Sequence, residues 1–219
     1  MTVLLIADDH PLFREALRGV AARTFPGTVI HEADQFDRLY DLVENYPDAD
    51  MLLLDLDIPG AHGFSALIHL RAIHPQLPIV IVSAHEDPTT VRRSIDHGAL
   101  GFIPKSSDAH TLGFALRQIL EGFPWVPDAI SEGTGADEDE LRIADRVREL
   151  TPQQFRVLQM LNSGQLNKQI AYRLNVSEAT IKAHMTHILR KLGASNRTQA
   201  VLIASKLGMP DDPSAGPSV

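Results

Sequence analysis

The stretch at 51–60, MLLLDLDIPG, constrains the fold of this chain more than any other. Four consecutive apolar residues run into acidic residues and then into a Pro-Gly pair. A short, continuous apolar run that ends at a turn signal is typical of a strand buried on both faces, as in a parallel sheet. Asp55 then stands at the carboxyl end of that strand, where open α/β sheets bind their ligands.

Strand and helix patterns alternate through residues 1–122. Five short apolar runs are predicted strands, and a segment with the apolar spacing of a helix follows each of them. The predicted strands cover residues 3–7, 28–33, 51–54, 78–83 and 100–103. Five such units in succession predict one doubly wound α/β domain.

Length and composition narrow the class of protein. A chain of 219 residues favours two unequal domains over one. The absence of cysteine excludes disulfides, thiolate metal sites and thiol nucleophiles. No stretch reaches the roughly 20 apolar residues of a membrane span, and the first residues lack the features of a signal peptide. We therefore expect a soluble, cytoplasmic protein with no membrane partner.

The net charge of −8 hides an asymmetry along the chain. Residues 149–208 carry eight Lys and Arg against two Glu, whereas residues 1–148 carry twelve Lys and Arg against twenty-four Asp and Glu. An acidic control module joined to a nucleic-acid-binding module would have this distribution. Ordinary surface variation would also produce it, so the asymmetry alone does not decide.

Chemically useful side chains follow four of the predicted strands. Asp8 and Asp9 come after the first, Asp55 after the third, Ser83 at the end of the fourth, and Lys105 just beyond the fifth. Because parallel strands bring their carboxyl ends to one edge, we expect these residues to converge. Three carboxylates need a cation, and a hard divalent ion such as Mg²⁺ meets that need. Asp55 would then be a nucleophile that forms an aspartyl phosphate.

This set of residues resembles the receiver domain of two-component response regulators, over residues 1–122. The resemblance implies a flavodoxin-like, five-stranded parallel sheet that takes a phosphoryl group from a sensor histidine kinase. Many receivers have proline directly after the lysine, whereas Ser106 follows it here. The matching positions are Asp8-Asp9, Asp55, Pro59, Gly63, Ser83, Ala84 and Lys105.

The resemblance also implies a role for each acidic position. Asp55 would be the phosphoacceptor, and Mg²⁺ would be held by Asp8, Asp9, Asp55 and the backbone carbonyl of Asp57. The side chain of Asp57 is interpreted as solvated. Taken alone, an Asp at a strand end is commonly a helix cap, and an Asp-Asp pair is commonly part of a loop. Their joint occurrence favours the phosphorylation site.

Four further positions take roles from the same resemblance. Lys105 would pair with the phosphoryl group, and Ser83 would hydrogen-bond one of its oxygens. Small Ala84 would leave room for the phosphodonor. Phe102 occupies the aromatic switch position, whose rotamer follows the movement of Ser83.

Histidines near the same strand ends have a simpler interpretation. Imidazole is a softer ligand than carboxylate and suits other metals than Mg²⁺. We therefore interpret His10, His62 and His85 as exposed loop residues.

Residues 123–148 change character and form a predicted linker. Proline, glycine and an acidic run dominate its first part. Leu141, Ala144 and Val147 then have the spacing of a short amphipathic helix, which would pack on either domain or on another subunit. The tail at 209–219 is rich in Pro, Ser and Asp, and it is predicted to be disordered.

Residues 149–208 contain helical patterns only. Thr151-Pro152 is a helix start, with Thr at the N-cap and Pro at the first position. A short second helix, 167–174, precedes a third from Glu178 to Leu192 that Ser177 caps and Gly193 ends; a fourth covers 197–207. Two short helices joined by a tight turn, the second rich in basic side chains, indicate a helix-turn-helix for the DNA major groove.

This segment resembles the LuxR-type four-helix DNA-binding domain, and the whole chain resembles the NarL/FixJ class of response regulators. The resemblance implies a homodimer on double-stranded DNA. The matching runs are Leu150-Thr151-Pro152, Gly164, Asn167-Lys168-Gln169-Ile170-Ala171, Leu174, Val176-Ser177-Glu178, Thr180-Ile181-Lys182-Ala183-His184 and Ile188-Leu189-Arg190-Lys191-Leu192.

The third helix has one apolar and one polar face. Its apolar face, Ile181, Met185, Ile188 and Leu192, is the predicted core side. By resemblance, Lys182, Ala183 and Thr186 on the other face meet base edges or nearby phosphates, and Ala183 suits a thymine methyl. The residues assigned to phosphates are Lys168, Thr180, His184, Arg190 and Lys191. The alternative is that these cations only solvate a helix face.

The fourth helix offers a surface of small side chains for dimerisation: Ala200, Val201 and Ala204. A two-fold dimer would read half-sites about 10 bp apart.

The leading hypothesis is a two-component response regulator, not an enzyme, whose phosphorylation on Asp55 controls DNA binding and transcription. One alternative is a haloacid-dehalogenase-like phosphatase that uses Asp55 and Asp57. Pro59 stands where that family wants Thr or Val, and Asp8-Asp9 would have no role. The other alternative is a receiver-like interaction module that works without phosphorylation.

Overall fold

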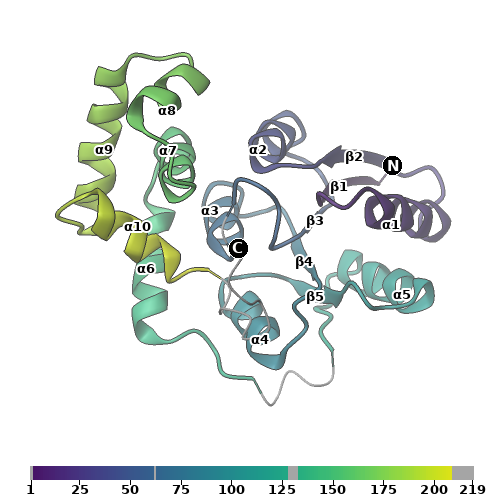
Figure 1. The fold of residues 1–219 in the computed structure, drawn as a ribbon. Helices are drawn as coiled ribbons and strands as arrows, with labels where there is room; N and C mark the ends of the chain where they lie inside the picture. Colours follow the sequence, from purple (N-terminus) through teal and green to yellow (C-terminus); the bar gives the residue numbers. More distant parts are fainter. Residues whose placement is uncertain (1, 62, 128–132, 209–219) are drawn as a thin grey trace, which may run out of the picture.

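The computed structural model describes residues 2–61, 63–127 and 133–208 (Figure 1). An α/β domain occupies the first part of the chain, and a lobe of helices follows it. Residues 128–132 of the predicted linker and the predicted tail at 209–219 lie outside the described residues. None of the helices in the described ranges is long and apolar enough to cross a membrane.

A five-stranded parallel sheet forms the centre of the α/β domain. Its order is β2-β1-β3-β4-β5, and all neighbouring pairs are parallel. All four residues of β3 are buried, because a continuous apolar run leaves no face for water. The predicted flavodoxin-like, doubly wound sheet is confirmed. The strands are β1 (Val3–Ala7), β2 (Val29–Ala33), β3 (Met51–Leu54), β4 (Ile79–Ser83) and β5 (Gly101–Pro104).

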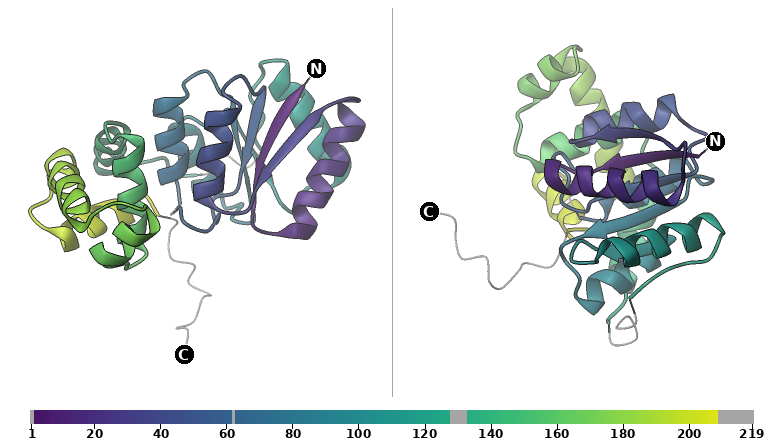
Figure 2. Two further views of the ribbon diagram at one scale, coloured as in Figure 1. Left: turned by 90° about the horizontal axis from the view of Figure 1, so that it is seen from above. Right: turned by 90° about the vertical axis from the view of Figure 1, so that its right-hand side faces the viewer.

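Helices cover both faces of the sheet (Figure 2). α1 (Pro11–Thr24) and α5 (Ala109–Leu120) enclose one apolar cluster with the side chains of one face. α2 (Phe36–Asn45), α3 (Ser65–Ile73) and α4 (Pro88–Asp96) cover the other face. This two-sided cover leaves the edge at the carboxyl ends of the strands free for a site.

Several helix ends in the helical lobe carry the capping residues that the sequence predicts. Thr151 and Gln154 form a capping box at the start of its second helix, and Ser177 caps the fourth. Gly193 ends that fourth helix with a φ of 66°, a conformation that favours glycine. The helices are α6 (Glu138–Arg148), α7 (Pro152–Asn162), α8 (Asn167–Arg173), α9 (Glu178–Leu192) and α10 (Arg197–Ser205).

The two lobes share one apolar cluster, which runs from the α2–α3 face into the helical lobe. Phe155 on α7 stacks on His69 of α3, with ring centroids 4.0 Å apart, and meets Phe36 edge-on at 5.5 Å. Burial lowers the pKa of His69 to about 4, so this imidazole is neutral at neutral pH. Gln159 Nε2 donates to Ser65 Oγ at 3.1 Å beside this stack. The sequence left open which domain the linker helix packs on; in this structure α6 packs on both, against α3 and α4 of the α/β domain and against α9 of the helical lobe.

A buried ionic cluster joins α4 to α6. Arg93 Nε donates to both carboxylate oxygens of Glu140 at 2.9 and 3.0 Å, and His97 Nε2 lies 2.5 Å from Glu140 Oε1. Arg93 also donates to the carbonyl of Gly208 at 3.2 Å, and its guanidinium lies 4.5 Å from the centre of the Phe64 ring. Arg93 and Glu140 are each 8% exposed and His97 is 1% exposed. The α4 helix therefore holds both the linker helix and the end of the helical lobe.

Replacing Glu140 with Gln should weaken this junction strongly. Removing one partner of a buried ion pair leaves the other charge uncompensated, so we expect the free energy of unfolding to fall by roughly 3 kcal/mol at neutral pH. Burial tends to raise the pKa of Glu140, but hydrogen bonds with His97 and Arg93 and the charge of Arg93 outweigh it and lower the pKa. The stabilisation is therefore complete above the unfolded-state pKa of about 4.3, and it is lost as the pH falls through the lower folded-state value.

Urea unfolding of the wild type and Glu140→Gln over a pH series measures this difference. Glu138→Gln is the matched control, because Glu138 lies exposed in the first turn of the same helix. The control should match the wild type at neutral pH. A Glu140→Gln penalty that equals the control's, or that grows in acid, would contradict this account of the junction.

Candidate functional site

Three loops with charged side chains meet at the carboxyl edge of the sheet. Asp8 follows β1, Asp55 follows β3, and Lys105 follows β5. Backbone hydrogen bonds continue the parallel ladder into these loops, since Asp55 N donates to Ala7 O and Lys105 N donates to Ser83 O, both at 2.8 Å. The positions of these side chains therefore follow from the register of the strands.

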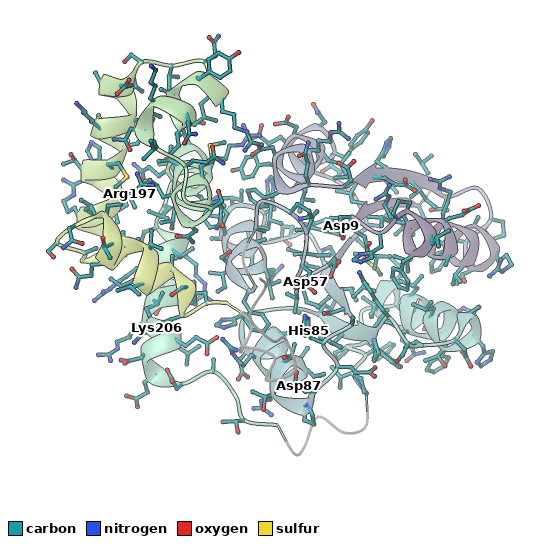
Figure 3. All side chains as sticks on the ribbon, in the orientation of Figure 1. Asp9, Asp57, His85, Asp87, Arg197 and Lys206 are labelled. Carbon is teal, nitrogen blue, oxygen red and sulfur yellow. The ribbon has the colours of Figure 1, made fainter. Side chains whose placement is uncertain are left out.

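The acidic residues and the lysine form one cluster. Lys105 Nζ lies 2.7 Å from Asp55 Oδ2 and 2.8 Å from Asp8 Oδ2. Asp8 and Asp55 are each 1% exposed, whereas Asp9, labelled in Figure 3, is half-buried. One ligand atom from each of Asp8, Asp9, His10 and Asp55 lies within 4.8 Å of the others. The predicted convergence is therefore present in the structure.

Burial and pairing set the charges of the cluster. Burial raises the pKa of the Asp55 carboxyl, and the hydrogen bond from Lys105 offsets part of that rise. Burial tends to lower the pKa of Lys105, but its hydrogen bonds with Asp55 and Asp8 outweigh this and raise the pKa of the ammonium. Lys105 therefore stays charged at neutral pH.

The donor set fits a hard divalent cation. Three carboxylates face a single ammonium, so with all of them ionised the cluster keeps an excess of two negative charges. Carboxylate oxygens are the ligands that Mg²⁺ prefers in proteins, usually with several waters. An acidic cluster of Asp8, Asp9 and Asp55 is typical of the Mg²⁺ site of receiver domains.

The remaining predicted switch residues lie around this edge. Ser83 is fully buried, and its Oγ accepts a hydrogen bond from His85 N at 3.1 Å, whereas Ala84 is exposed. Phe102 is fully buried in the apolar cluster on the α2–α4 side of the sheet. The peptide bond after Lys105 is trans.

Three neighbours of the cluster had no predicted role in the site. His10 is exposed, as expected, but its Nδ1 lies 2.7 Å from Asp9 Oδ1. The ring of Phe13 lies 5.2 Å from Lys105 Nζ, in cation–π range. His85 Nε2 lies 3.1 Å from Asp57 Oδ2; both are labelled in Figure 3. His10 and Phe13 stand on either side of the Pro11 helix start, directly after Asp8-Asp9. That place in the sequence could have indicated that they lie beside the acidic residues. His62 lies outside the described residues.

The α9 helix presents a polar face to solvent on the side of the helical lobe away from the sheet (Figure 1). Its predicted core face is confirmed, because Ile181, Met185, Ile188 and Leu192 are buried. Among the residues predicted to meet DNA, Lys168, Lys182, Ala183, Thr186 and Arg190 are exposed, and Thr180, His184 and Lys191 are half-buried.

Lys191 has a structural role as well. Its Nζ donates to Glu149 O at 2.7 Å and to Gln154 Oε1 at 2.8 Å. Lys191 thereby ties the end of α9 to the start of α7.

The surface predicted on α10 needs a correction. Ala200 and Ala204 are 0% and 2% exposed, because the stripe they share packs inside the helical lobe against α7 and α9. They do not form a free surface in this structure. Val201 is half-buried, and Leu202, which was not predicted, is 62% exposed.

Fold and site together define a class of protein. Its members have an α/β domain with an acidic site at the strand ends, and this domain is joined to a helix-turn-helix domain. Residues 4–117 match the model of the response regulator receiver domain, and residues 148–204 match that of the bacterial regulatory proteins of the luxR family. The chain belongs to the two-component response regulators with a LuxR-type DNA-binding domain, a family that controls transcription. Membership of this family removes the phosphatase hypothesis.

Named relatives are similar in sequence to nearly the whole of this chain. The glycerol metabolism activator of Pseudomonas putida is 43% identical, over 94% of this chain and 96% of its own length. The nitrate/nitrite response regulator NarL of Escherichia coli K12 is 31% identical, over 92% and 93%. A solved structure of RcsB from Salmonella enterica, bound to promoter P1flhDC in the presence of the phosphomimetic BeF3⁻, has a similar fold. It aligns with a TM-score of 0.54 and 24% identity, over 94% of this chain and 98% of its own.

Proposed function

We propose that a sensor histidine kinase phosphorylates this response regulator on Asp55, and that the phosphoryl group controls how two copies of the chain bind DNA. The observation that carries this proposal is the contact of one half-buried ammonium, that of Lys105, with both Asp55 and Asp8 at the edge of the sheet. We place the protein in the cytoplasm, as is typical of this family, where it can reach DNA.

The transfer uses the carboxylate of Asp55 as a nucleophile. The P–N bond of a phosphohistidine breaks as a P–O bond to Asp55 forms, and the departing imidazole of the kinase is protonated. Lys105 pairs with the transferred group, Ser83 donates a hydrogen bond to one of its oxygens, and exposed Ala84 leaves the donor room to approach. When bound, Mg²⁺ supplies positive charge to the phosphoryl oxygens. Its ligands in this proposal are Asp8, Asp9, Asp55 and the backbone carbonyl of Asp57.

The signal passes to α4. A pull on Ser83 by the phosphoryl group changes the loop that leads into α4, and Phe102 repacks beside it. Because α4 holds the linker helix through Arg93, His97 and Glu140, a shift of α4 loosens the junction between the lobes. Phosphorylation thus shifts an equilibrium between two arrangements of the same domains.

In this proposal, phosphorylation does not control access to α9, the helix predicted to enter the DNA major groove. The outer face of α9 is exposed while the lobes are packed together, since the α/β domain contacts α6, α7 and the end of α10. We therefore assign the control to the pairing of two chains, with Val201 and Leu202 on α10 as the dimer surface. A solved assembly of RcsB, described as two dimers bound to two parallel DNAs, supports pairing on DNA. The name of the Pseudomonas relative supports activation as the output.

A genomic DNase footprint, with and without acetyl phosphate, tests this function. We expect phosphorylated protein to protect paired half-sites about 10 bp apart at concentrations where unmodified protein protects neither fully. Identical footprints in both states would favour the alternative function, an interaction module that works without phosphorylation.

A further inference from the structure

Arg14 links the acidic loop to the edge strand of the sheet. It lies in the first turns of α1, with its side chain 18% exposed. Its Nη1 donates to the backbone carbonyl of Asp8 at 2.6 Å, and its Nε lies 3.6 Å from Glu32 Oε2 on β2. A long, flexible side chain is thereby held at both a main-chain group and an ion-pair partner.

The carbonyl that Arg14 holds belongs to the peptide unit between Asp8 and Asp9. Asp8 and Asp9 flank that unit, and each has a ligand atom within 4.8 Å of one from Asp55, so a shift of the unit would move the backbone that carries both carboxylates. Two other bonds fix the Asp8 side of the loop, from Asp8 N to Ala33 O at 3.0 Å and from His10 N to Asp8 Oδ1 at 2.7 Å. Arg14 contacts the carbonyl of the peptide unit itself, which neither of those two bonds engages.

We propose that Arg14 is a positioning residue for the divalent ion, because it keeps the Asp8-Asp9 peptide unit oriented so that both carboxylates face Asp55. This inference rests on the proposed phosphorylation site. Partners that orient metal ligands typically change metal affinity by 10- to 100-fold when they are removed.

If the charge of Arg14 were its only effect, removing it would change Mg²⁺ affinity in the opposite direction. The guanidinium of Arg14 is a cation near the site and repels a bound cation, so its removal would tighten Mg²⁺ binding if charge were its only effect. Loss of orientation would weaken Mg²⁺ binding. The sign of the change therefore separates positioning from charge.

The chain offers a matched control on the same helix. Arg18 lies one helical turn beyond Arg14, and its Nη2 is 2.5 Å from Glu32 Oε1. It shares the Glu32 partner and the charge of Arg14, but its side chain is 56% exposed, and the Asp8 carbonyl accepts from Arg14 instead. Its replacement removes the same charge without freeing the Asp8 carbonyl.

Isothermal titration calorimetry of the full chain with Mg²⁺ alone tests the inference, with no phosphodonor present. Arg14→Met should raise the dissociation constant about tenfold, and Arg18→Met should leave it within about twofold of the wild type. Arg14→Lys keeps one donor and should recover most of the affinity. Unfolding in the absence of Mg²⁺ checks that each variant is folded, and Arg14→Gln replaces Arg14→Met if the latter does not fold.

An unchanged or lower dissociation constant in a folded Arg14→Met or Arg14→Gln protein would overturn the positioning role. An equal weakening by Arg18→Met would do the same. If the wild type binds Mg²⁺ but Asp55 takes no phosphoryl group from acetyl phosphate, the proposed function fails while the role of Arg14 in ion binding stands.

Discussion

Asp55→Asn should lose covalent phosphorylation completely. The amide lacks the negative charge of the carboxylate and is a poor nucleophile, although it keeps the size and most of the contacts of Asp55. Intact-mass spectrometry after incubation with acetyl phosphate and Mg²⁺ measures the result. We expect the wild type to gain the mass of one phosphoryl group and the variant to gain none.

Asp57→Asn is the control for this experiment. The Asp57 side chain is 45% exposed and pairs with His85, and the proposed site uses only its backbone carbonyl. This variant should still be labelled. Labelling that persists on Asp55→Asn, or that disappears from Asp57→Asn as well, would show that the phosphoacceptor is assigned to the wrong carboxylate.

Ala183→Glu should weaken specific DNA binding strongly. Ala183 is exposed on the outer face of α9, so a longer side chain costs little in folding. In the major groove, however, the new carboxylate would face base-edge acceptors and phosphates, and like charges brought together at an interface cost several kcal/mol. We expect affinity for footprinted DNA to fall by about a hundredfold or more, measured by fluorescence anisotropy.

Ala22→Glu carries the same change to an exposed position on α1 of the receiver domain. It adds the same charge to the whole protein, so it controls for general repulsion from DNA. Its affinity should stay close to that of the wild type. Equal losses in the two variants would mean that α9 does not read DNA in the proposed way.

The sheet and its site were predictable because local sequence specifies them. A strand buried on both faces requires a continuous apolar run, and the short run at 51–54, which ends at a turn signal, is typical of one. Parallel strands then force the residues that follow them to one edge. Asp8, Asp55 and Lys105 are therefore brought together by topology, although 97 positions separate the first from the last.

The packing of the two lobes was not predictable in the same way. In the sequence, Glu140 is one more charge in an acidic run. Its partners, Arg93 and His97, lie 47 and 43 positions away, and no local pattern links them to it. Phe155 and His69 each belong to an apolar helical stripe that serves equally well inside one domain or between two. Pattern shows that a face is apolar, but not what covers it.

The same limit explains the correction on α10. Small side chains suit a helix–helix contact, but Ala200 and Ala204 use that property within the lobe, against α7 and α9. The exposed position is Leu202, two residues along the same helix. A one-dimensional pattern assigns residues to a stripe; burial in three dimensions decides whether the stripe faces inward.

The control of DNA binding by Asp55 is the central claim, and one footprinting series tests it most directly. Wild type and Asp55→Asn are compared on the same DNA, each with and without acetyl phosphate. We predict that acetyl phosphate lowers the concentration needed for protection by the wild type and leaves Asp55→Asn unchanged. A matching shift in both proteins, or no shift in the wild type, would contradict the claim.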